Sequence, residues 1–307
     1  MLRRLFTCTL FLLSATASRY PSFGTLQTNT SSGIMNVVIN NTFSTINLID
    51  FHILADLANL IEDLQQNDTD VRVAVFSSAN PEYFTAHLDL NFFLPGYESP
   101  LPLLDPGNPE MPFPMAVLYN ITQLPQATIA VVEGRARDFG NELILAMDMR
   151  FALNSPSVQL AQTEPSFGFN PAGGSQFLAQ SLIGRGRAFE YSFSSYNIDA
   201  VTAAQIGWVN RAFDTQSELH TYVQALAGRI ALFPPAGIQA TKAGINAVSL
   251  IPLDAWIQQA RNIVEVLAPS TAAQELLKKY MRVTNNQTNG EVELNYGNGE
   301  DVVELLS

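Results

Sequence analysis

The sequence predicts an α/β fold that ends in a helical region, on three observations. Apolar segments typical of strands, at residues 34–40, 71–77 and 128–132, alternate with segments of helical periodicity. From residue 216 onward the pattern is helical, with prolines at the joints. The chain has 307 residues, of which 47% are hydrophobic and 14% charged, enough for one large core. Strands that alternate with helices indicate an α/β core.

The elements of the core follow one another in chain order. Asp50 is the expected cap of a helix whose apolar residues recur on one face. Residues 94–114 are rich in Pro, Gly and Asn, and a loop of this length is expected to be a lid or a pocket wall. The strand at 128–132 precedes a helix that begins near Gly140, and the chain returns through residues 150–153. The apolar residues of the first helix are Ile53, Leu57, Leu60, Ile61 and Leu64.

Prolines divide the C-terminal region into separate helices. Asp254 is a candidate cap for one of them, and Thr271 with Gln274 forms a capping-box pattern for the next. After Arg282 the chain has Asn, Gly and acidic residues but no Lys or Arg, which favours a solvated tail. The predicted division is a signal peptide at 1–17, a core at 18–215, a helical oligomerisation region at 216–282 and an acidic, disordered tail at 283–307.

The N-terminus has the pattern of a secretory signal peptide. Arg3 and Arg4 precede an apolar run at residues 5–13, and small residues follow, with cleavage expected after Ala17. We therefore expect a secreted protein. The alternative is a mitochondrial presequence, because no acidic residue precedes Asp50. No later stretch approaches the roughly 20 apolar residues of a transmembrane helix, so no membrane span is expected.

The composition limits the chemistry that the mature chain can perform. Its only cysteine, Cys8, lies in the predicted signal peptide, which excludes a disulfide, a thiolate nucleophile or a cysteine metal site after cleavage. The histidines at 52, 87 and 220 lack ligand spacing, so we expect no metal. Five N-x-S/T sequons, which are candidate glycosylation sites, also support secretion. They are Asn29, Asn40, Asn67, Asn120 and Asn286.

The charge excludes two classes of partner. The formal net charge is -12 and the sequence pI is about 4.6. A balance this acidic repels nucleic-acid phosphates and the anionic leaflet of a membrane. We therefore expect neither nucleic acid nor a polybasic membrane contact.

Four ordered segments resemble the enoyl-CoA hydratase/isomerase (crotonase) family. Ile46-Asn47 is similar to the family's Asn-Ala-Leu region, and YFTAHLDL at 83–90 is similar to F-x-A-G-A-D-L. GRARDFGNEL at 134–143 resembles G-x-x-x-G-G-G-x-E-L. QTE at 162–164, followed by Gly168 and PAGGSQ at 171–176, resembles Q-P-E, then G, then P-G-x-G-G-T-Q. Each segment alone is weak evidence for the family, but the ordered set is specific. Segments at 183–188 and 204–211 extend the resemblance.

The resemblance implies a fold, an assembly and a chemistry. The fold is the ClpP/crotonase-type spiral of ββα units, with a C-terminal helical region that packs on neighbouring subunits in a homotrimer or hexamer. The chemistry passes through the enolate of an acyl thioester, whose oxygen is held by two backbone N–H groups. By position these belong to Leu88 and Phe139. No metal or redox cofactor is implied, because CoA arrives as part of the substrate.

Two glutamates match the acidic positions of the family. By resemblance, Glu164 handles the α-proton, and Glu142 positions and activates the water that adds across the 2,3 double bond. If only one carboxylate is competent, double-bond isomerisation is the expected reaction instead. The alternative for Glu142 is an acidic residue that offsets a helix dipole, and for Glu164 a solvated carboxylate in a loop.

This chain departs from the family pattern around the expected oxyanion site. Asp138 and Phe139 stand in the glycine run, and His87 replaces a glycine of the first oxyanion loop. The candidate substrate-binding residues are Ala86, His87, Asp138 and Gly140. The departures and the secretory N-terminus leave a second hypothesis, a secreted binding protein or pseudoenzyme that has the fold without turnover.

Overall fold

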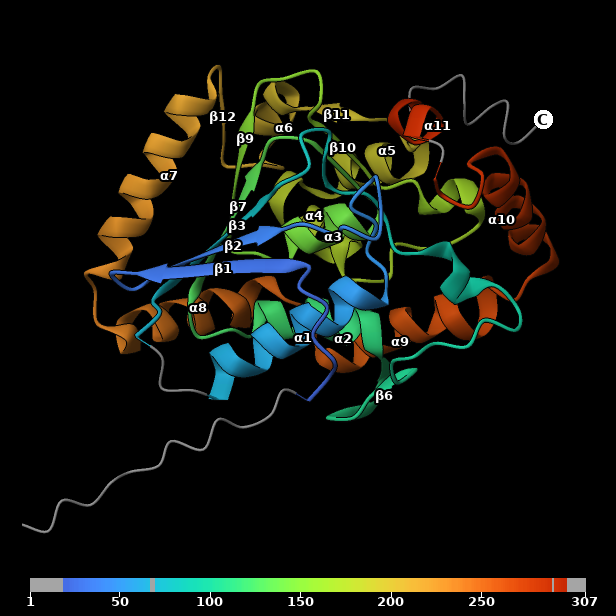
Figure 1. Cartoon of the computed structure of the whole chain (residues 1–307), viewed down its shortest axis with the longest axis horizontal. Helices are drawn as coiled ribbons and strands as arrows, with labels where there is room; N and C mark the ends of the chain where they lie inside the picture. The colour runs from blue at the N-terminus through green and yellow to red at the C-terminus, as the bar shows by residue number, and fades with distance from the viewer. Residues whose placement is uncertain (1–18, 67–69, 289, 297–307) are drawn as a thin grey trace, which may run out of the picture.

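The computed structural model describes residues 19–66, 70–288 and 290–296 and is built on a six-stranded sheet (Figure 1). The strand order is β1-β2-β3-β7-β9-β12, with β1 antiparallel to β2 and every other pair parallel. The predicted signal peptide and the sequon at Asn67 lie outside the described residues. The strands are β1 (Leu26–Ser31), β2 (Ile34–Ile39), β3 (Val73–Ser78), β7 (Ala127–Val132), β9 (Met149–Leu153) and β12 (Arg211–Phe213).

A smaller sheet has the order β11-β10-β8-β4. The chain passes from β7 to β8 to α3, and from β9 to β10 to α4, so that each unit gives one strand to each sheet and then a helix. This confirms the predicted spiral of ββα units. The strands are β4 (Tyr83–Thr85), β8 (Arg135–Arg137), β10 (Gln159–Ala161) and β11 (Ile198–Asp199); β5 (Leu104–Asp105) and β6 (Asn108–Pro112) form a separate pair.

The central strands are buried on both faces because alternate side chains enter different cores. In β3, Val73 and Val75 pack toward α7 (Gln216–Ala231), whereas Ala74 and Phe76 belong to the main core. This explains why these strands read as continuous apolar runs. The helices of the main core region are α1 (Phe51–Gln66), η1 (Leu90–Phe93), α2 (Phe113–Thr122), α3 (Phe139–Leu145), η2 (Glu164–Phe167), α4 (Ser175–Ile183), α5 (Arg185–Ser194) and α6 (Ala200–Ile206).

Helix α1 forms as predicted. The Asp50 side chain accepts hydrogen bonds from the N–H groups of His52 (2.9 Å) and Ile53 (3.2 Å), as an N-cap does. The expected apolar face is buried along the whole helix. The loop at 94–114 lines a pocket beside α1 and α2, through Asp105, Gly107 and Asn108, although it contributes no residue to the lining of the cavity described below. It also contains the β5–β6 pair.

The C-terminal helices extend from one end of the molecule, where Figure 1 places α7, to the other, where it places α10 and α11. The predicted capping box is wrong by one residue, because Ser270 accepts the N–H of Ala273 (3.3 Å) and starts the helix. Asp254 lies in the first turn of its helix after Pro252, which is the N-cap. These helices are α8 (Pro235–Ser249), α9 (Leu253–Asn262), the π-helix η3 (Ile263–Leu267), α10 (Thr271–Val283) and α11 (Gly290–Asn295).

The prediction of a solvated, disordered tail from residue 283 is wrong for residues 284–288 and 290–296. Thr284, Gln287 and Glu293 are buried, and α11 packs against the core. The composition did not predict this because polar contacts, as well as the packing of Leu294 and Tyr296, hold the segment. Residues 297–307 lie outside the description. Among the described residues, no helix has both the length and the apolar character needed to cross a bilayer.

Gly140 allows α3 to approach the end of β4, and this contact is testable. A Cβ at residue 140 would lie 2.2 Å from the Ala86 carbonyl oxygen and 2.4 Å from that of Thr85. We expect Gly140→Ala to lower the free energy of unfolding by about 1–3 kcal/mol through overpacking, measured by urea denaturation. Gly228→Ala in α7 is the matched control, because a Cβ there meets nothing within 4 Å. It should raise stability by roughly 0.5–1 kcal/mol; equal stabilities of Gly140→Ala and wild type would contradict the argument.

Candidate active site

A buried cavity of about 40 Å³ lies where α3, η2, the loop after β4 and α10 meet. Its lining is apolar except for a few ionisable side chains, which is the arrangement of a site that orients a ligand by a small number of polar groups. The cavity therefore brings together residues that the sequence places far apart. It is lined by His87, Leu88, Leu90, Phe93, Met115, Asp138, Phe139, Glu142, Glu164, Phe167, Phe169, Ala172, Ile263 and Tyr280.

The carboxyl group of Glu142, on α3, is held by two backbone N–H groups at and just before the start of α4. Its Oε1 accepts the N–H of Gly173 (2.8 Å) and that of Ser175 (3.3 Å). A Cβ at residue 173 would lie 2.6 Å from Glu142 Oε2, so only glycine leaves room for the carboxyl group. Burial raises the pKa of Glu142 to about 7, although the hydrogen bonds from Ser175 and Gly173 oppose that shift.

Glu164 is oriented by a chain of buried side-chain hydrogen bonds that the sequence did not reveal. The Trp208 indole N–H donates to Asn141 Oδ1 (3.0 Å), and Asn141 Nδ2 donates to Gln162 Oε1. Gln162 Nε2 then donates to both carboxyl oxygens of Glu164 (2.9 and 3.1 Å). Because the indole nitrogen can only donate, it fixes the direction of both amides and therefore the donor that faces Glu164. Trp208 thus orients this chain as well as filling the core.

The two glutamates differ in acidity. Burial, followed by the negative charges of Asp138 and Glu142, holds the pKa of Glu164 well above its usual value. Glu142 has two backbone donors, whereas Glu164 has a single amide donor. When the pair of carboxyl groups loses its first proton, Glu142 is therefore the group that ionises. Glu164 keeps its proton and can act as the general acid. Neither the dipole-offsetting role nor the solvated loop fits, because both carboxyl groups are buried.

The Leu88 N–H lies on the side of its strand segment away from Ile49. The Ile49 N–H donates to His87 O (3.0 Å) and the Asp89 N–H donates to Ile49 O (2.9 Å), so the N–H and C=O of Leu88 itself point the opposite way. Phe139 is the first residue of α3, where an N–H has no partner within the helix. Neither N–H donates to any atom of the described residues.

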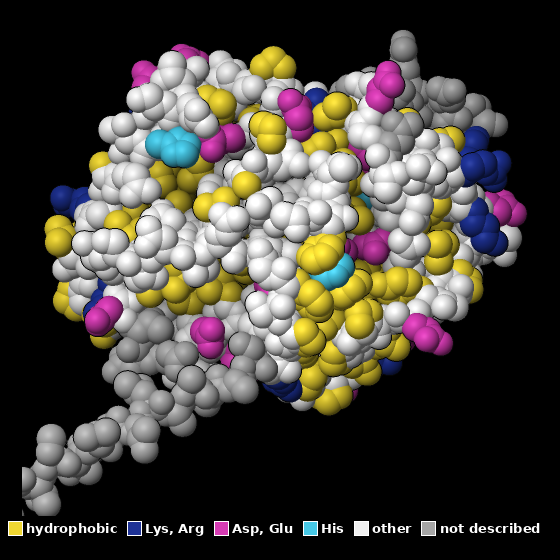
Figure 2. Space-filling view, in the orientation of Figure 1, with side chains coloured by type: hydrophobic (Ala, Val, Ile, Leu, Met, Phe, Trp, Pro, Cys, Tyr) yellow, Lys and Arg dark blue, Asp and Glu magenta, His cyan; other side chains and the backbone are white. Residues whose placement is uncertain are grey.

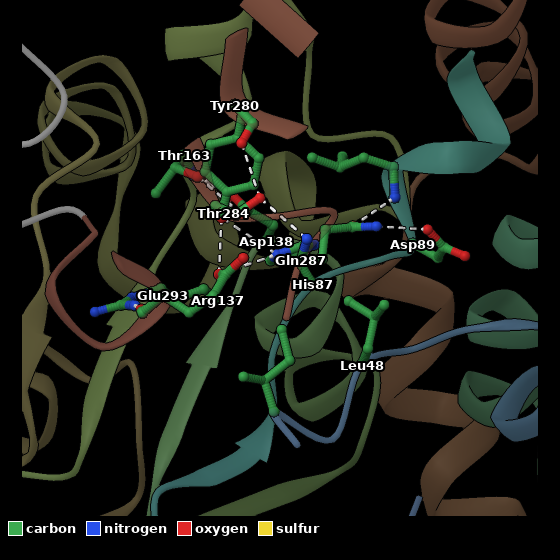
Figure 3. A network of polar contacts seen from close by, with 12 residues as sticks. Leu48, His87, Asp89, Arg137, Asp138, Thr163, Tyr280, Thr284, Gln287 and Glu293 are labelled. Carbon is green, nitrogen blue, oxygen red and sulfur yellow. Dashed lines mark hydrogen bonds and ion pairs between the residues drawn. The ribbon is translucent and has the colours of Figure 1, made fainter. Parts of the chain in front are cut away.

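Asp138 occupies a backbone conformation that favours glycine, with φ 49° and ψ −122°. Its carboxylate accepts the Thr163 N–H and hydroxyl, the latter at 2.8 Å to each oxygen. Figure 3 shows Thr163 pointing at Asp138 in this way. These hydrogen bonds offset part of the strain and hold a negative charge at the cavity wall.

The structure separates the four predicted substrate-binding residues into two pairs. His87 and Asp138 line the cavity, whereas Ala86 and Gly140 do not. Ala86 packs in a small cluster with Ile46, and Gly140 faces the backbone of the loop after β4. The described residues contain no group of three or more His, Cys, Asp or Glu placed to hold a metal ion. Of the predicted glycosylation sites, Asn29 and Asn286 are exposed, and Asn40 and Asn120 are partly buried.

Comparison with known proteins gives a consistent result. The family model described as enoyl-CoA hydratase/isomerase matches residues 29–287. A short-chain-enoyl-CoA hydratase of Clostridium acetobutylicum is 27% identical over 215 residues, which is 70% of this chain and 78% of the relative. The 2,3-dehydroadipyl-CoA hydratase of Escherichia coli is 27% identical over 228 residues, 74% of this chain and 85% of the relative. The crystal structure of a candidate enoyl-CoA hydratase from Streptomyces avermitilis has 30% identity and a TM-score of 0.79, covering 92% of this chain and 98% of that one.

The buried Glu142 should cost stability at neutral pH. Its folded pKa of about 7 lies above the ordinary value of 4.5, so the native state binds more protons than the unfolded state between these values. Stability therefore falls as pH rises through this window, by at most about 3 kcal/mol. We expect Glu142→Gln to melt at a higher temperature than wild type at pH 8 and at a similar temperature at pH 4, measured by calorimetry. Glu275→Gln, which removes an exposed carboxylate of α10, is the control; a Glu142→Gln melting temperature below wild type at pH 8 would refute this account.

Proposed function

This chain belongs to the enoyl-CoA hydratase/isomerase family, and from that premise we propose that it adds or removes water across the 2,3 double bond of an unsaturated acyl-CoA. One observation supports the proposal above all others. Two buried carboxyl groups of unequal acidity, Glu142 and Glu164, line one cavity together with the residues of two unpaired backbone N–H groups. Paired carboxyl groups of this kind suit general acid and base catalysis.

The backbone donors would bind the thioester oxygen. The N–H groups of Leu88 and Phe139 are fixed before the substrate arrives, one by the contact with Ile49 and the other by the start of α3. Negative charge builds on the thioester oxygen as the enolate forms, and fixed donors in a dry site stabilise that charge without reorganising. The side chains at both positions can vary because the donors are main-chain groups.

The glutamates would divide the proton transfers between them. In hydration, ionised Glu142 takes a proton from water while the water oxygen bonds to C3, and the π electrons move onto the thioester oxygen. When the enolate collapses, protonated Glu164 gives its proton to C2. Proton exchange from Glu142 back to Glu164, through solvent or directly, restores the starting state. Dehydration is the same sequence reversed.

Two features favour an acyl-CoA as the substrate. The acyl group would meet the apolar part of the cavity, which includes Phe93, Met115 and Ile263. Basic side chains gather at the edge of the molecule where α10 lies (Figures 1 and 2). In α10, Lys278 and Arg282 are exposed on the helix that gives Tyr280 to the cavity, and they are suited to the phosphates of CoA. The acyl group and the phosphates would thus lie on opposite sides of the thioester.

A second candidate function is a secreted binding protein without turnover. It is favoured by the Asp138 carboxylate, which lines the cavity beside Phe139 and would repel an enolate oxygen. The signal-peptide pattern also separates the chain from the compartments that hold acyl-CoA. In this case the chain would bind an acyl thioester and release it unchanged.

The predicted assembly also has a candidate surface. A groove of about 780 Å³ runs between α8 and the large sheet, and apolar side chains project around it. Ile245 is 59% exposed and Val248 is 87% exposed, which is unusual for a surface that meets only water. We infer that a second copy of the chain covers this groove in a trimer or hexamer.

Light scattering tests the assembly. Wild type should have three or six times the mass of one chain at micromolar concentration. Ile245→Glu should lower the mass, because it places a charge in an apolar contact. Gln258→Glu on α9 adds the same charge at an exposed polar position outside the groove, so it is the control and should keep the wild-type mass. A monomeric wild type would refute the inference.

Activity of the two glutamine variants tests the hydratase proposal. Glu142→Gln and Glu164→Gln should each lower kcat on an enoyl thioester by roughly 10² to 10⁴, because each removes a proton acceptor or donor while keeping its shape. The double variant should lose far less than the product of the two, since the residues act on one transition state. Binding of the thioester, measured by calorimetry, should persist in all three.

The outcomes separate the alternatives. Activity of Glu142→Gln within about twofold of an active wild type would exclude the two-carboxylate hydratase and leave a one-base isomerase. Binding of enoyl thioesters by the wild type without turnover of any of them would support the binding protein. No binding at millimolar ligand would exclude both.

A further inference from the structure

The C-terminal segment 284–296 is tied directly to the loop 87–90, which contains Leu88. Gln287 Oε1 accepts the Leu90 N–H (2.9 Å), and Gln287 Nε2 donates to Asp89 Oδ1 (2.8 Å). Gln287 is buried, and Figure 3 shows its amide directed at the loop. One side chain therefore fixes two consecutive residues of the loop by two hydrogen bonds.

A second contact joins the same loop to α11. His87 Nε2 lies 3.3 Å from Glu293 Oε2, and the Tyr280 hydroxyl donates to that oxygen at 2.7 Å. All three side chains are buried (Figure 3), and His87 and Tyr280 also line the cavity. Since burial makes an unpaired charge costly, Glu293 requires partners of this kind.

The partners of His87 determine its charge. Nδ1 lies 2.9 Å from the Leu88 carbonyl oxygen, which can only accept, and Nε2 faces the Glu293 carboxylate. With Glu293 ionised, both ring nitrogens donate, which makes the ring an imidazolium. Burial by itself would lower the pKa of His87, but the Glu293 carboxylate raises it to about 9, with smaller contributions from Leu88 and Asp138. The ionisable groups around the ring are Glu293 from α11, Tyr280 from α10 and Asp138 before α3.

Two buried arginines of β8 hold α11 in place. Arg137 donates to the carbonyl oxygens of Glu293 and Leu294, the latter at 3.2 Å. Arg135 Nε donates to Leu294 O at 3.1 Å. These carbonyls are at the C-terminal end of the helix, where cations are favourable. The position of Glu293 is thus set by the core sheet and not by the tail alone.

We propose that Gln287 and Glu293 are positioning residues of the active site, which hold the loop 87–90 so that the Leu88 N–H faces the cavity with a charged His87 beside it. The role of the Leu88 N–H rests on the proposed function. The His87 imidazolium would partly offset the Asp138 carboxylate at the cavity wall, where the enolate charge develops. The C-terminal segment is then a working part of the site rather than a tail.

NMR of histidine-labelled protein tests the charge of His87 without reference to turnover. In wild type the His87 ring should stay protonated through pH 8. In Glu293→Gln the midpoint should fall to about 6.5 or below, the range of an ordinary or a buried histidine. Glu291→Gln, which removes an exposed acid two residues earlier in α11, is the matched control and should titrate as wild type. A His87 ring that is neutral at pH 7.5 in wild type overturns the proposal.

Kinetics test the positioning. Glu293→Gln should lower kcat on an enoyl thioester roughly 10- to 100-fold at pH 8, with a smaller loss near pH 5.5 where His87 regains its proton. Gln287→Met should lower kcat by a similar factor at every pH, with KM nearly unchanged. A purely structural role for Glu293 would lower the melting temperature and leave the pH profile unchanged, and a purely structural role for Gln287 would lower the melting temperature and leave kcat within about twofold. Either result overturns the proposal. Wild type that shows the expected His87 titration but no turnover contradicts the proposed function and leaves the contact between Glu293 and His87 supported.

Discussion

The burial of two carboxyl groups in one cavity is the constraint on which the rest of the site depends. Taking Glu142 and Glu164 out of water favours their neutral forms, so each needs specific donors to be useful. Gly173 supplies a backbone N–H to Glu142, and its lack of a Cβ leaves room for the carboxyl group. Trp208 sets the direction of the amides that reach Glu164. The difference in acidity between two identical side chains thus comes from their neighbours.

Two of the positions where this chain departs from the family pattern, Asp138 and His87, have a specific polar partner. Asp138 occupies a glycine-like conformation, and Thr163 satisfies its carboxylate. His87 stands where a glycine is expected, and its ring is paired with Glu293. The opposite charges of His87 and Asp138 both border the cavity. Under the proposed pairing of a charged His87 with Glu293, these two departures would balance charge at the cavity wall and would not be independent losses of a motif.

The C-terminal segment shows how a polar stretch can be a structural part of a core. Its stability comes from hydrogen bonds between groups that water would otherwise satisfy, so each bond contributes only when its partner is already in place. The arginines of β8 supply such preformed partners for α11. The segment in turn fixes the loop that precedes η1, about 200 residues earlier in the chain. Gln287 and Glu293 are therefore linked by hydrogen bonds to the loop at residues 87–90.

The sequence by itself determined the elements that depend on local patterns. The period of apolar residues and the cap at Asp50 predicted α1, and the ordered motifs identified the fold and the two glutamates. Only the tertiary structure showed that burial raises the pKa of both glutamates, which predicted residues line the cavity, and that Gln287 and Glu293 contact the loop at 87–90. The physical reason is that these properties arise from burial and from hydrogen bonds between segments that are far apart in the sequence. A polar segment has the same local sequence pattern whether its side chains form hydrogen bonds with water or with the protein.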